Sequence, residues 1–378
     1  MLLALLLIQT VVGFDPDPWW GIDPRSEQAQ LPHILITPTL AIVLHWLTMF
    51  VGLAAIVLCL ARSTGREGER LILVALALVP PFVIFVLSSN WTGEGLVRCL
   101  GWSAGAYAAV AAFYLGRQRR QRRIIVAALL AMLVPWLVRA GWYVLVEHPA
   151  TIEHYRRNLE PFLEARGWMK GSSQHELYER RLMKSAATGA FGFSNVFGTM
   201  AGAMAMLAAG CAAGAIRRQR WAPAALTVVI ALMGLTIVFM TGSKGAALAV
   251  VVVAGVLAIA LIPRIPRRLI AAAAVAAVAA AFAAILVRGA IGPPEDHTGE
   301  RSLLFRYHYV QAAWRMLNEE PDVWMDGVGV NRFQQLYQRY KPALSPEEVK
   351  SAHSVVVDWT VMLGWAGGLW CILLVVWL

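Results

Sequence analysis

Two apolar runs, APAALTVVIALMGLTIVFM at 222–240 and AALAVVVVAGVLAIALI at 246–262, are separated by the short polar stretch TGSKG at 241–245. An α-helix rises 1.5 Å per residue, so apolar runs of about 17 to 25 residues match the hydrocarbon core of a bilayer. We therefore predict two membrane-spanning helices joined by a tight polar turn.

The composition of the whole chain agrees with a membrane protein. Of its 378 residues, 58% are hydrophobic and 15% are charged, whereas an ordinary globular domain carries about 25% charged residues. So much apolar surface also excludes a disordered chain. The predicted fold class is all-α: one polytopic integral membrane domain over 1–378, a helical bundle of about ten spans. The spans are expected near 1–13, 34–61, 71–89, 99–116, 124–146, 190–215, 222–240, 246–262, 269–288 and 354–378.

The net charge of +10 is distributed as a topology signal. Basic residues gather in every second connecting segment, and the positive-inside rule assigns such segments to the cytoplasm. They lie at 62–70, 117–123, 216–221 and 263–268. Two long loops, 147–189 and 289–352, are then extracytoplasmic. Their charges nearly balance, and we expect both loops to contain short amphipathic helices. The basic surplus thus reflects topology, and we expect no nucleic-acid partner.

The cysteines predict neither a metal site nor a disulfide framework. All four lie inside apolar runs without the spacing of metal ligands, which suits small packing residues. They are Cys59, Cys99, Cys211 and Cys371. The apolar start, 1–13, lacks a basic leader and a small-residue cleavage site, so we do not expect a signal peptide.

The second long loop carries residues whose spacing suggests chemistry. An amphipathic helix is expected after Glu300, and Pro321 ends it. Its apolar stripe is predicted at Leu303, Tyr307, Val310, Trp314 and Leu317, with Arg301, His308 and Arg315 on another face. A second short helix follows, with Phe333, Leu336, Tyr337 and Tyr340 on one side.

The turn between these helices, Gly327-Val328-Gly329-Val330-Asn331, has two interpretations. Asn331 is a plausible N-cap, and a glycine turn before a helix can offer backbone N–H groups to an anion. Alternatively, the turn only connects two amphipathic helices.

Ser351-Ala352-His353-Ser354 stands at the mouth of the last span. A histidine there can act as a general base near neutral pH, or it can merely cap a helix. Asp358 follows one and a half turns later, too far along the helix to be assured as the group that orients His353.

Further cations lie close to predicted membrane boundaries. Lys244 is packed between small residues of the 241–245 turn, which suits a phosphate-bearing ligand, although a lone lysine there often only snorkels. Arg139, within the 124–146 span, is either functional or snorkels towards the surface. Arg180 and Arg181 precede the helix start that contains Asn195, and they are either ligand-binding groups or solvated loop charges.

Together these segments resemble the O-antigen ligase / O-antigen polymerase superfamily. TGSKGAALAV (241–250) is similar to the family's Thr-x-Ser-Arg-Gly turn, and ATGAFGFSNVFGTM (187–200) resembles its Gly-x-Phe-x-x-x-Asn helix start. FRYHYVQAAW (305–314), Pro321…Gly327-x-Gly329…Phe333 and AHSVVVDWTVMLGWAGG (352–368) follow in the family's order. Three residues depart from the pattern: Lys244 replaces arginine, Ser354 replaces asparagine, and Met362 stands where an acid is common.

The resemblance implies a multi-pass protein of the bacterial inner membrane whose active site faces the periplasm. Such a protein transfers a glycan from an undecaprenyl-diphosphate carrier to an acceptor sugar hydroxyl, with inversion and without metal or other cofactors. Its partners would be membrane lipids, the lipid-linked donor, and either the lipid A core or a second lipid-linked glycan as acceptor. Under this hypothesis His353, Arg306 and Lys244 are catalytic. Donor-binding residues are Arg301, Arg180, Arg181, Arg139, Gly327, Gly329, Asn331 and Asn195.

Two other classes stay open on the sequence alone. A secondary transporter is also polytopic, but it is expected to place charged or broken-helix sites near the middle of the membrane. A non-catalytic membrane assembly protein would not need His353, Arg306 and Lys244 to act together.

Overall fold

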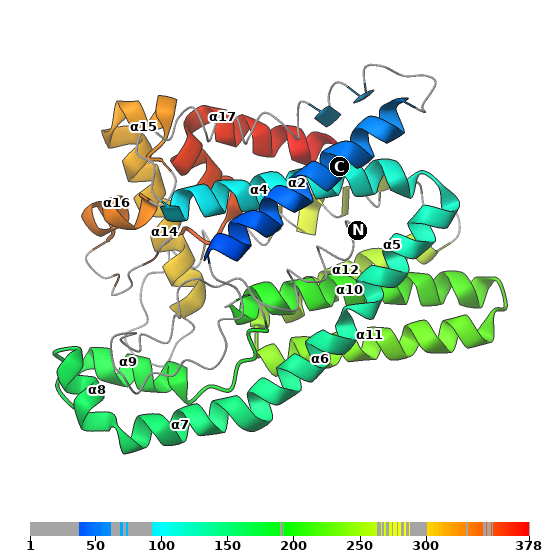
Figure 1. The fold of residues 1–378 in the computed structure, drawn as a ribbon. Helices are drawn as coiled ribbons and strands as arrows, with labels where there is room; N and C mark the ends of the chain where they lie inside the picture. Colours follow the sequence, from blue (N-terminus) through cyan, green and yellow to red (C-terminus); the bar gives the residue numbers. More distant parts are fainter. Residues whose placement is uncertain are drawn as a thin grey trace. The chain divides into compact units, whose positions relative to one another are not determined.

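The structure, a computed structural model, consists of helices throughout its described part (Figure 1). That part comprises 38–61, 69–70, 73–74, 93–189, 191, 193–262, 266, 268–269, 272–273, 275–277, 279–280, 283–284, 287, 301–329, 332–342, 345, 349 and 351–377. Within it, side chains at 38–41, 93–98, 173–174, 177, 181, 301–303, 321 and 374–377 are not described. The predicted all-α class is confirmed.

Seven helices in the described residues are long and apolar enough to cross a membrane. They correspond to the predicted spans near 34–61, 99–116, 124–146, 190–215, 222–240, 246–262 and 354–378. The other three predicted spans, 1–13, 71–89 and 269–288, fall wholly or largely outside the described residues. The chain is therefore a multi-pass membrane protein.

By its internal contacts the chain divides into two compact units. In its described residues, unit 1 comprises α2 (Pro38–Ala61), α4 (Gly93–Gly116), α14 (Arg301–Glu319), α15 (Pro321–Asp326), α16 (Phe333–Tyr340) and α17 (Val355–Trp377). Unit 2 comprises α5 (Arg119–Ala131), α6 (Leu133–Trp142), the π-helix η1 (Tyr143–Glu147), α7 (His148–Arg157), α8 (Leu159–Ala165), α9 (Ser173–Leu182), α10 (Ser194–Arg217), α11 (Trp221–Thr241) and α12 (Lys244–Leu261).

In unit 2 the span predicted at 124–146 does not end at residue 146. Helical structure continues from Arg119 to Arg157, well beyond residue 146, so the first loop begins inside a helix. The π-helix η1 ends two residues before Pro149, whose backbone nitrogen carries no hydrogen for the regular helical bond. The loop then folds as α7, α8 and α9, and α8 and α9 lie side by side in Figure 1. The rings of Phe162 and Tyr178 join them at 4.9 Å.

Small residues allow the helices of unit 2 to approach closely. One face of α10 is fully or almost fully buried at Ala201, Ala205, Ala208 and Ala212. Gly234 of α11 packs on this face, where a Cβ would lie 2.8 Å from the Cβ of Ala205. Such small-on-small contacts substitute for a hydrophobic driving force, which is weak between helices in lipid.

The helices α10 and α12 run in the same direction. Gly198 and Gly202 of α10 lie against Ala246 and Val250 of α12, respectively, so equal steps along the two helices stay in register. Both helices therefore begin at the same end of unit 2, where the 241–245 turn also lies.

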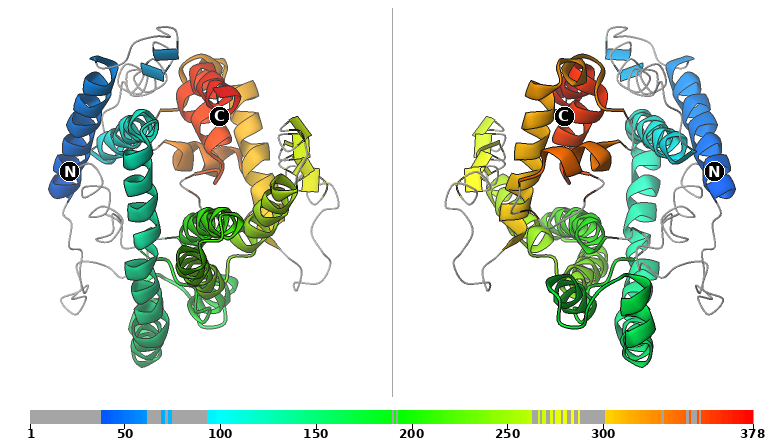
Figure 2. Two further views of the ribbon diagram at one scale, coloured as in Figure 1. Left: turned by 90° about the vertical axis from the view of Figure 1, so that its right-hand side faces the viewer. Right: turned by 90° about the vertical axis from the view of Figure 1, so that its left-hand side faces the viewer.

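In unit 1, α2 packs against α4, and the shorter helices α14, α15 and α16 gather around α17 (Figure 2). Gly52 of α2 lies against Tyr107 of α4. Trp102 of α4 meets Trp359 of α17 with ring centroids 5.0 Å apart. The second long loop is thus built into unit 1 rather than extended away from it.

Replacing Gly234 with Leu should destabilise unit 2, because the new side chain has no room against Ala205 and the Ala201 carbonyl. Overpacking of this kind costs about 1–3 kcal/mol. We expect a clearly lower melting temperature of the purified full-length chain in detergent. The matched control is Gly255→Leu on α12, where a Cβ meets nothing within 4 Å. Equal melting temperatures for the two variants would contradict this packing.

Candidate functional site

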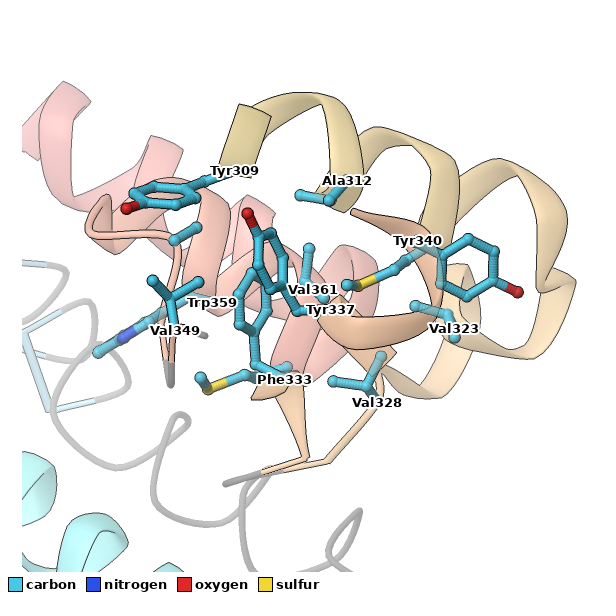
Figure 3. Packing of buried hydrophobic residues seen from close by; sticks show 14 of the residues in the cluster. Tyr309, Ala312, Val323, Val328, Phe333, Tyr337, Tyr340, Val349, Trp359 and Val361 are labelled. Carbon is cyan, nitrogen blue, oxygen red and sulfur yellow. The ribbon is translucent and has the colours of Figure 1, made fainter. Parts of the chain in front are cut away.

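An aromatic core organises the second loop of unit 1 (Figure 3). Phe333 and Tyr337 of α16 are fully buried and stacked, with ring centroids 5.7 Å apart. Tyr337 also meets Tyr309 of α14 edge to face at 5.8 Å. The Tyr337 hydroxyl lies 2.9 Å from the Ser345 hydroxyl, which satisfies a buried polar group. The predicted apolar face of the second short helix is confirmed at Phe333, Tyr337 and Tyr340.

Glu320, between α14 and α15, fastens α16 to this core. Its Oε1 accepts a hydrogen bond from the Tyr340 hydroxyl at 2.7 Å and another from Arg339 at 3.2 Å. The bond that Tyr340 donates raises the pKa of its phenol, because ionisation would remove the donated proton. The three short helices are therefore tied by polar as well as apolar contacts.

The predicted apolar stripe of α14 is wrong by about one position. Trp314 is 65% exposed, and Arg315 is exposed while His308 is buried. The buried face consists of Leu304, His308, Tyr309, Ala312, Ala313 and Met316. Because α14 packs against α15, α16 and α17, its small residues Ala312 and Ala313 are buried in the shared core.

The last span is broken at Gly364, which the sequence analysis did not anticipate. Gly364 has φ 63° and ψ −156°, far from helical values. In an unbroken helix, the carbonyls of Val361 and Met362 would accept from the amides four residues later. Here they accept instead from Val328 at 2.8 Å and Gly329 at 3.2 Å. The turn after α15 thus forms a backbone clasp with the broken helix.

The glycines of this clasp allow the two backbones to touch. A Cβ on Gly327 would lie 2.3 Å from the Met362 carbonyl oxygen, and one on Gly364 would lie 2.5 Å from the Met325 carbonyl oxygen. The amides of Val328 and Gly329 therefore donate to the clasp, which favours the interpretation of this turn as a connection between helices. Asn331, the expected N-cap, lies outside the described residues, and Arg332 occupies the N-cap position of α16 without a side-chain cap.

His353 sits in a strained loop that Asp358 holds. Its φ of 55° is left-handed, a conformation that costs a residue with a Cβ about 1–2 kcal/mol. Asp358 accepts from the Ala352 amide at 2.6 Å and from the Ser351 hydroxyl at 2.7 Å. The Ser351 hydroxyl in turn accepts from the His353 amide at 3.0 Å. The loop is thereby fixed while the His353 side chain stays exposed.

Tyr309 of α14 links that helix to the His353 loop, because its ring lies 5.6 Å from the His353 ring. Arg306 precedes Tyr309 by three residues on α14, and residues three apart are neighbours on a helix surface. The half-buried Arg306 is therefore one helical turn from the residue that contacts His353. Arg301 begins α14, and its side chain lies outside the described part.

In unit 2, the 241–245 turn presents Lys244 at the start of α12. Gly242 ends α11 with a left-handed φ of 58°, and the Ser243 hydroxyl caps α12 by accepting from the Ala246 amide at 3.2 Å. Thr241 is fully buried and donates to the Val238 carbonyl at 2.6 Å. The turn is rigid, and Lys244 is exposed on it.

A second lysine reaches this turn. A Cβ on Gly242 would lie 3.6 Å from Cε of Lys184, and the Ala187 amide donates to the Met240 carbonyl at 3.0 Å. The segment after α9 is therefore fastened to the end of α11. The side chain of Lys184 thus lies at the turn that contains Lys244, although the two lysines are far apart in the sequence.

Of the other predicted residues of unit 2, Arg139 and Arg180 each lie beside a carboxylate. Arg139 is paired with Glu147 at 2.8 Å, which neutralises its charge within the long helix. Arg180 is exposed and lies 3.5 Å from Glu176, one turn earlier on α9. Arg181 is on α9 with its side chain outside the described part. Asn195, near the start of α10, accepts from the Val196 amide at 2.9 Å.

Comparison with known proteins supports the resemblance seen in the sequence. Residues 229–372 match the family model described as O-antigen ligase. This part of the chain is similar to O-antigen ligases, which supports the O-antigen ligase / O-antigen polymerase superfamily. The matched region includes Lys244, Arg306 and the His353 loop, and it supports an O-antigen ligase-like membrane glycosyltransferase. Neither the curated proteins nor the solved structures contain a match to the chain.

The residues that hold the His353 loop were only partly visible to sequence reasoning. Asp358 seemed too far along α17, because helical spacing ignores a loop that folds back over the first turn. Tyr309 gave a usable signal, since it lies one turn after Arg306. In the described residues, no three His, Cys, Asp or Glu side chains gather as metal ligands.

Replacing Gly327 with Ala should disrupt the clasp, because the added Cβ meets the Met362 backbone. Gly329→Ala is the matched control. Gly329 also has a positive φ, 83°, but its Cβ would meet only Arg332 Cδ, at 3.7 Å. We expect Gly327→Ala to make α16 readily cleaved by protease, while Gly329→Ala loses only about 1 kcal/mol of stability. Equal protease resistance of the two variants would contradict the clasp.

Proposed function

We propose that this membrane glycosyltransferase moves a glycan from an undecaprenyl-diphosphate carrier to an acceptor sugar hydroxyl on the periplasmic side of the bacterial inner membrane. The observation that carries the proposal is the strained, hydrogen-bonded loop that presents His353 beside Tyr309, one helical turn from Arg306 on α14. Strain of this kind persists only where the surroundings enforce it, and it concentrates at functional sites.

In the proposed reaction His353 accepts the proton of the acceptor hydroxyl. The acceptor oxygen then forms a bond to the anomeric carbon of the donor, and the bond from that carbon to the phosphate oxygen breaks. The electron pair leaves with undecaprenyl diphosphate. Attack opposite the leaving group inverts the anomeric centre. General-base catalysis by a positioned histidine contributes about 10²–10⁴-fold to such a step.

Cations are required because the diphosphate gains negative charge as it leaves. Fixed positive groups stabilise that charge more in the transition state than in the ground state. Arg306 and Lys244 are the first choices, with Arg301, Arg180, Arg181 and Asn195 as supporting groups. Arg139 is a weaker choice, because its ion pair with Glu147 already offsets its charge. Gly327 and Gly329 act indirectly, by holding the loop against α17.

Lysine in place of the family's arginine changes how the donor is held. Lys244 offers a compact point charge without the planar fork that binds two oxygens at once. Lys184, whose side chain lies beside Gly242 of that turn, would provide a second ammonium that offsets this loss. The diphosphate would then be bound by two point charges rather than by one bidentate group.

The acceptor separates two branches of the function. The test deletes the gene from the cells that carry it. Accumulation of single repeat units on the carrier then identifies a polymerase. Accumulation of long carrier-linked chains identifies a ligase that acts on the lipid A core. Unchanged lipid-linked glycans would favour the transporter or assembly-protein alternatives. The match to the O-antigen ligase model favours the enzyme over both of these alternatives.

His353→Ala and Arg306→Ala should each lower transfer by about 10²-fold or more, by removing the base or a stabilising cation. The measurement is the consumption of lipid-linked glycan in membranes with equal protein levels. Arg315→Ala is the matched control, because Arg315 is an exposed arginine of the same helix. Wild-type consumption by both His353→Ala and Arg306→Ala would refute the mechanism.

Lys244→Gln should weaken use of the donor by about 10-fold or more, because a charge-assisted bond to phosphate is lost. Lys244→Arg should retain or improve activity, because it restores the residue typical of the family. The readout is the donor concentration at half-maximal rate. Lys170→Gln, at an exposed lysine of the first loop, serves as the control. A Lys244→Gln variant with unchanged donor dependence would exclude a role for Lys244 in binding.

A further inference from the structure

We propose that Asp358 is a positioning residue that, together with Ser351, holds His353 in the conformation needed for proton removal. The inference rests on the proposed function and concerns the same site. Asp358 itself would not touch the substrate. Its role is to hold the loop that carries the base.

The hydrogen bonds form a continuous path from the carboxylate to the histidine. One oxygen of Asp358 accepts from the Ala352 amide at 2.6 Å, and the other accepts from the Ser351 hydroxyl at 2.7 Å. That hydroxyl accepts from the amide of His353 at 3.0 Å. The Asp358 amide also donates to the Ser354 carbonyl at 2.8 Å. Both sides of the histidine are therefore tied to the same aspartate.

The backbone of His353 needs this restraint. At φ 55° an L-residue is strained, and a loop without enforced bonds would relax into an ordinary conformation. Relaxation would rotate the imidazole away from its place beside the Tyr309 ring. A displacement of about 1 Å at a catalytic group can cost about 10²-fold in rate. The path through Ser351 thus has a direct consequence for the chemistry.

The residue types fit the role closely. A carboxylate offers two acceptor oxygens, and the two donors, an amide and a hydroxyl, require both. Asparagine at the same position would keep one acceptor, but its NH₂ group cannot accept the Ser351 proton. Serine at 351 is needed as both donor and acceptor, and alanine there would cut the path without disturbing the Ala352 bond.

An acid in the first turn of a helix also stabilises the helix itself. This structural role is separable from positioning. Loss of a helix cap lowers stability, whereas loss of positioning lowers the turnover number and leaves binding of the donor intact. Ser351→Ala is the more selective variant, because it leaves the Asp358 carboxylate in the first turn of α17.

The test measures turnover number, donor KM and melting temperature of the full-length chain in lipid nanodiscs. The donor is the carrier-linked glycan extracted from cells that lack the gene, and the acceptor is supplied by their membranes. We expect Ser351→Ala and Asp358→Asn to lower the turnover number by about 10- to 100-fold with donor KM within about twofold. Ser351→Thr, which keeps the hydroxyl, should restore most of the rate.

Thr360→Val is the control, because the Thr360 hydroxyl only donates to the Val356 carbonyl of the same helix, at 2.7 Å. If His353→Ala is inactive while Ser351→Ala and Asp358→Asn turn over at the wild-type rate, the inference fails and the proposed function stands. If His353→Ala and Arg306→Ala both turn over at the wild-type rate, the proposed mechanism itself fails. If Asp358→Asn only melts earlier and Ser351→Ala is fully active, Asp358 is a helix cap, and the inference is likewise overturned.

Discussion

The second loop of unit 1 depends on one backbone contact, the clasp between the turn after α15 and the broken helix α17. The break at Gly364 diverts the carbonyls of Val361 and Met362 from their helical partners, and the amides of Val328 and Gly329 take their place. A backbone carbonyl without a donor is costly in an apolar surrounding. The break in α17 therefore depends on the turn after α15. Gly327 is required because the Met362 backbone lies against it, and Gly364 is required because the Met325 backbone lies against it.

The clasp fixes the position of the candidate catalytic residues, because it holds the helices on either side of it. Before the clasp, α14 carries Arg306 and Tyr309, and after it α17 begins with the His353 loop and Asp358. Because α14, α16 and α17 share the aromatic core around Tyr337, the loop cannot drift away from Tyr309. In unit 2, the capped 241–245 turn exposes Lys244, and the side chain of Lys184 packs beside Gly242 of this turn. Each unit thus holds its polar groups on packed elements rather than on free loops.

Much of the fold followed from hydrophobic patterning. The seven described spans were predicted because each needs only a run of apolar residues, a property local to the chain. The short helices of both loops were also anticipated, since amphipathic spacing and Pro321 are local signals. The predicted buried face of α14 was wrong. The spacing of its large apolar residues suggested one face, but close packing against three neighbouring helices buries the face that carries Ala312 and Ala313. The break at Gly364 gave no signal in a continuous apolar run.

By itself, the sequence determined the membrane class, the helix order and the family motifs, including His353, Arg306 and Lys244. These rest on composition and on residues that stand close together in the chain. Only the tertiary structure decided that Asp358 holds the His353 loop, that Lys184 reaches the turn of Lys244, and that the amides of Val328 and Gly329 donate to carbonyls of α17. The physical reason is that hydrogen bonds and close backbone contacts depend on where the chain folds back, which residue spacing does not specify.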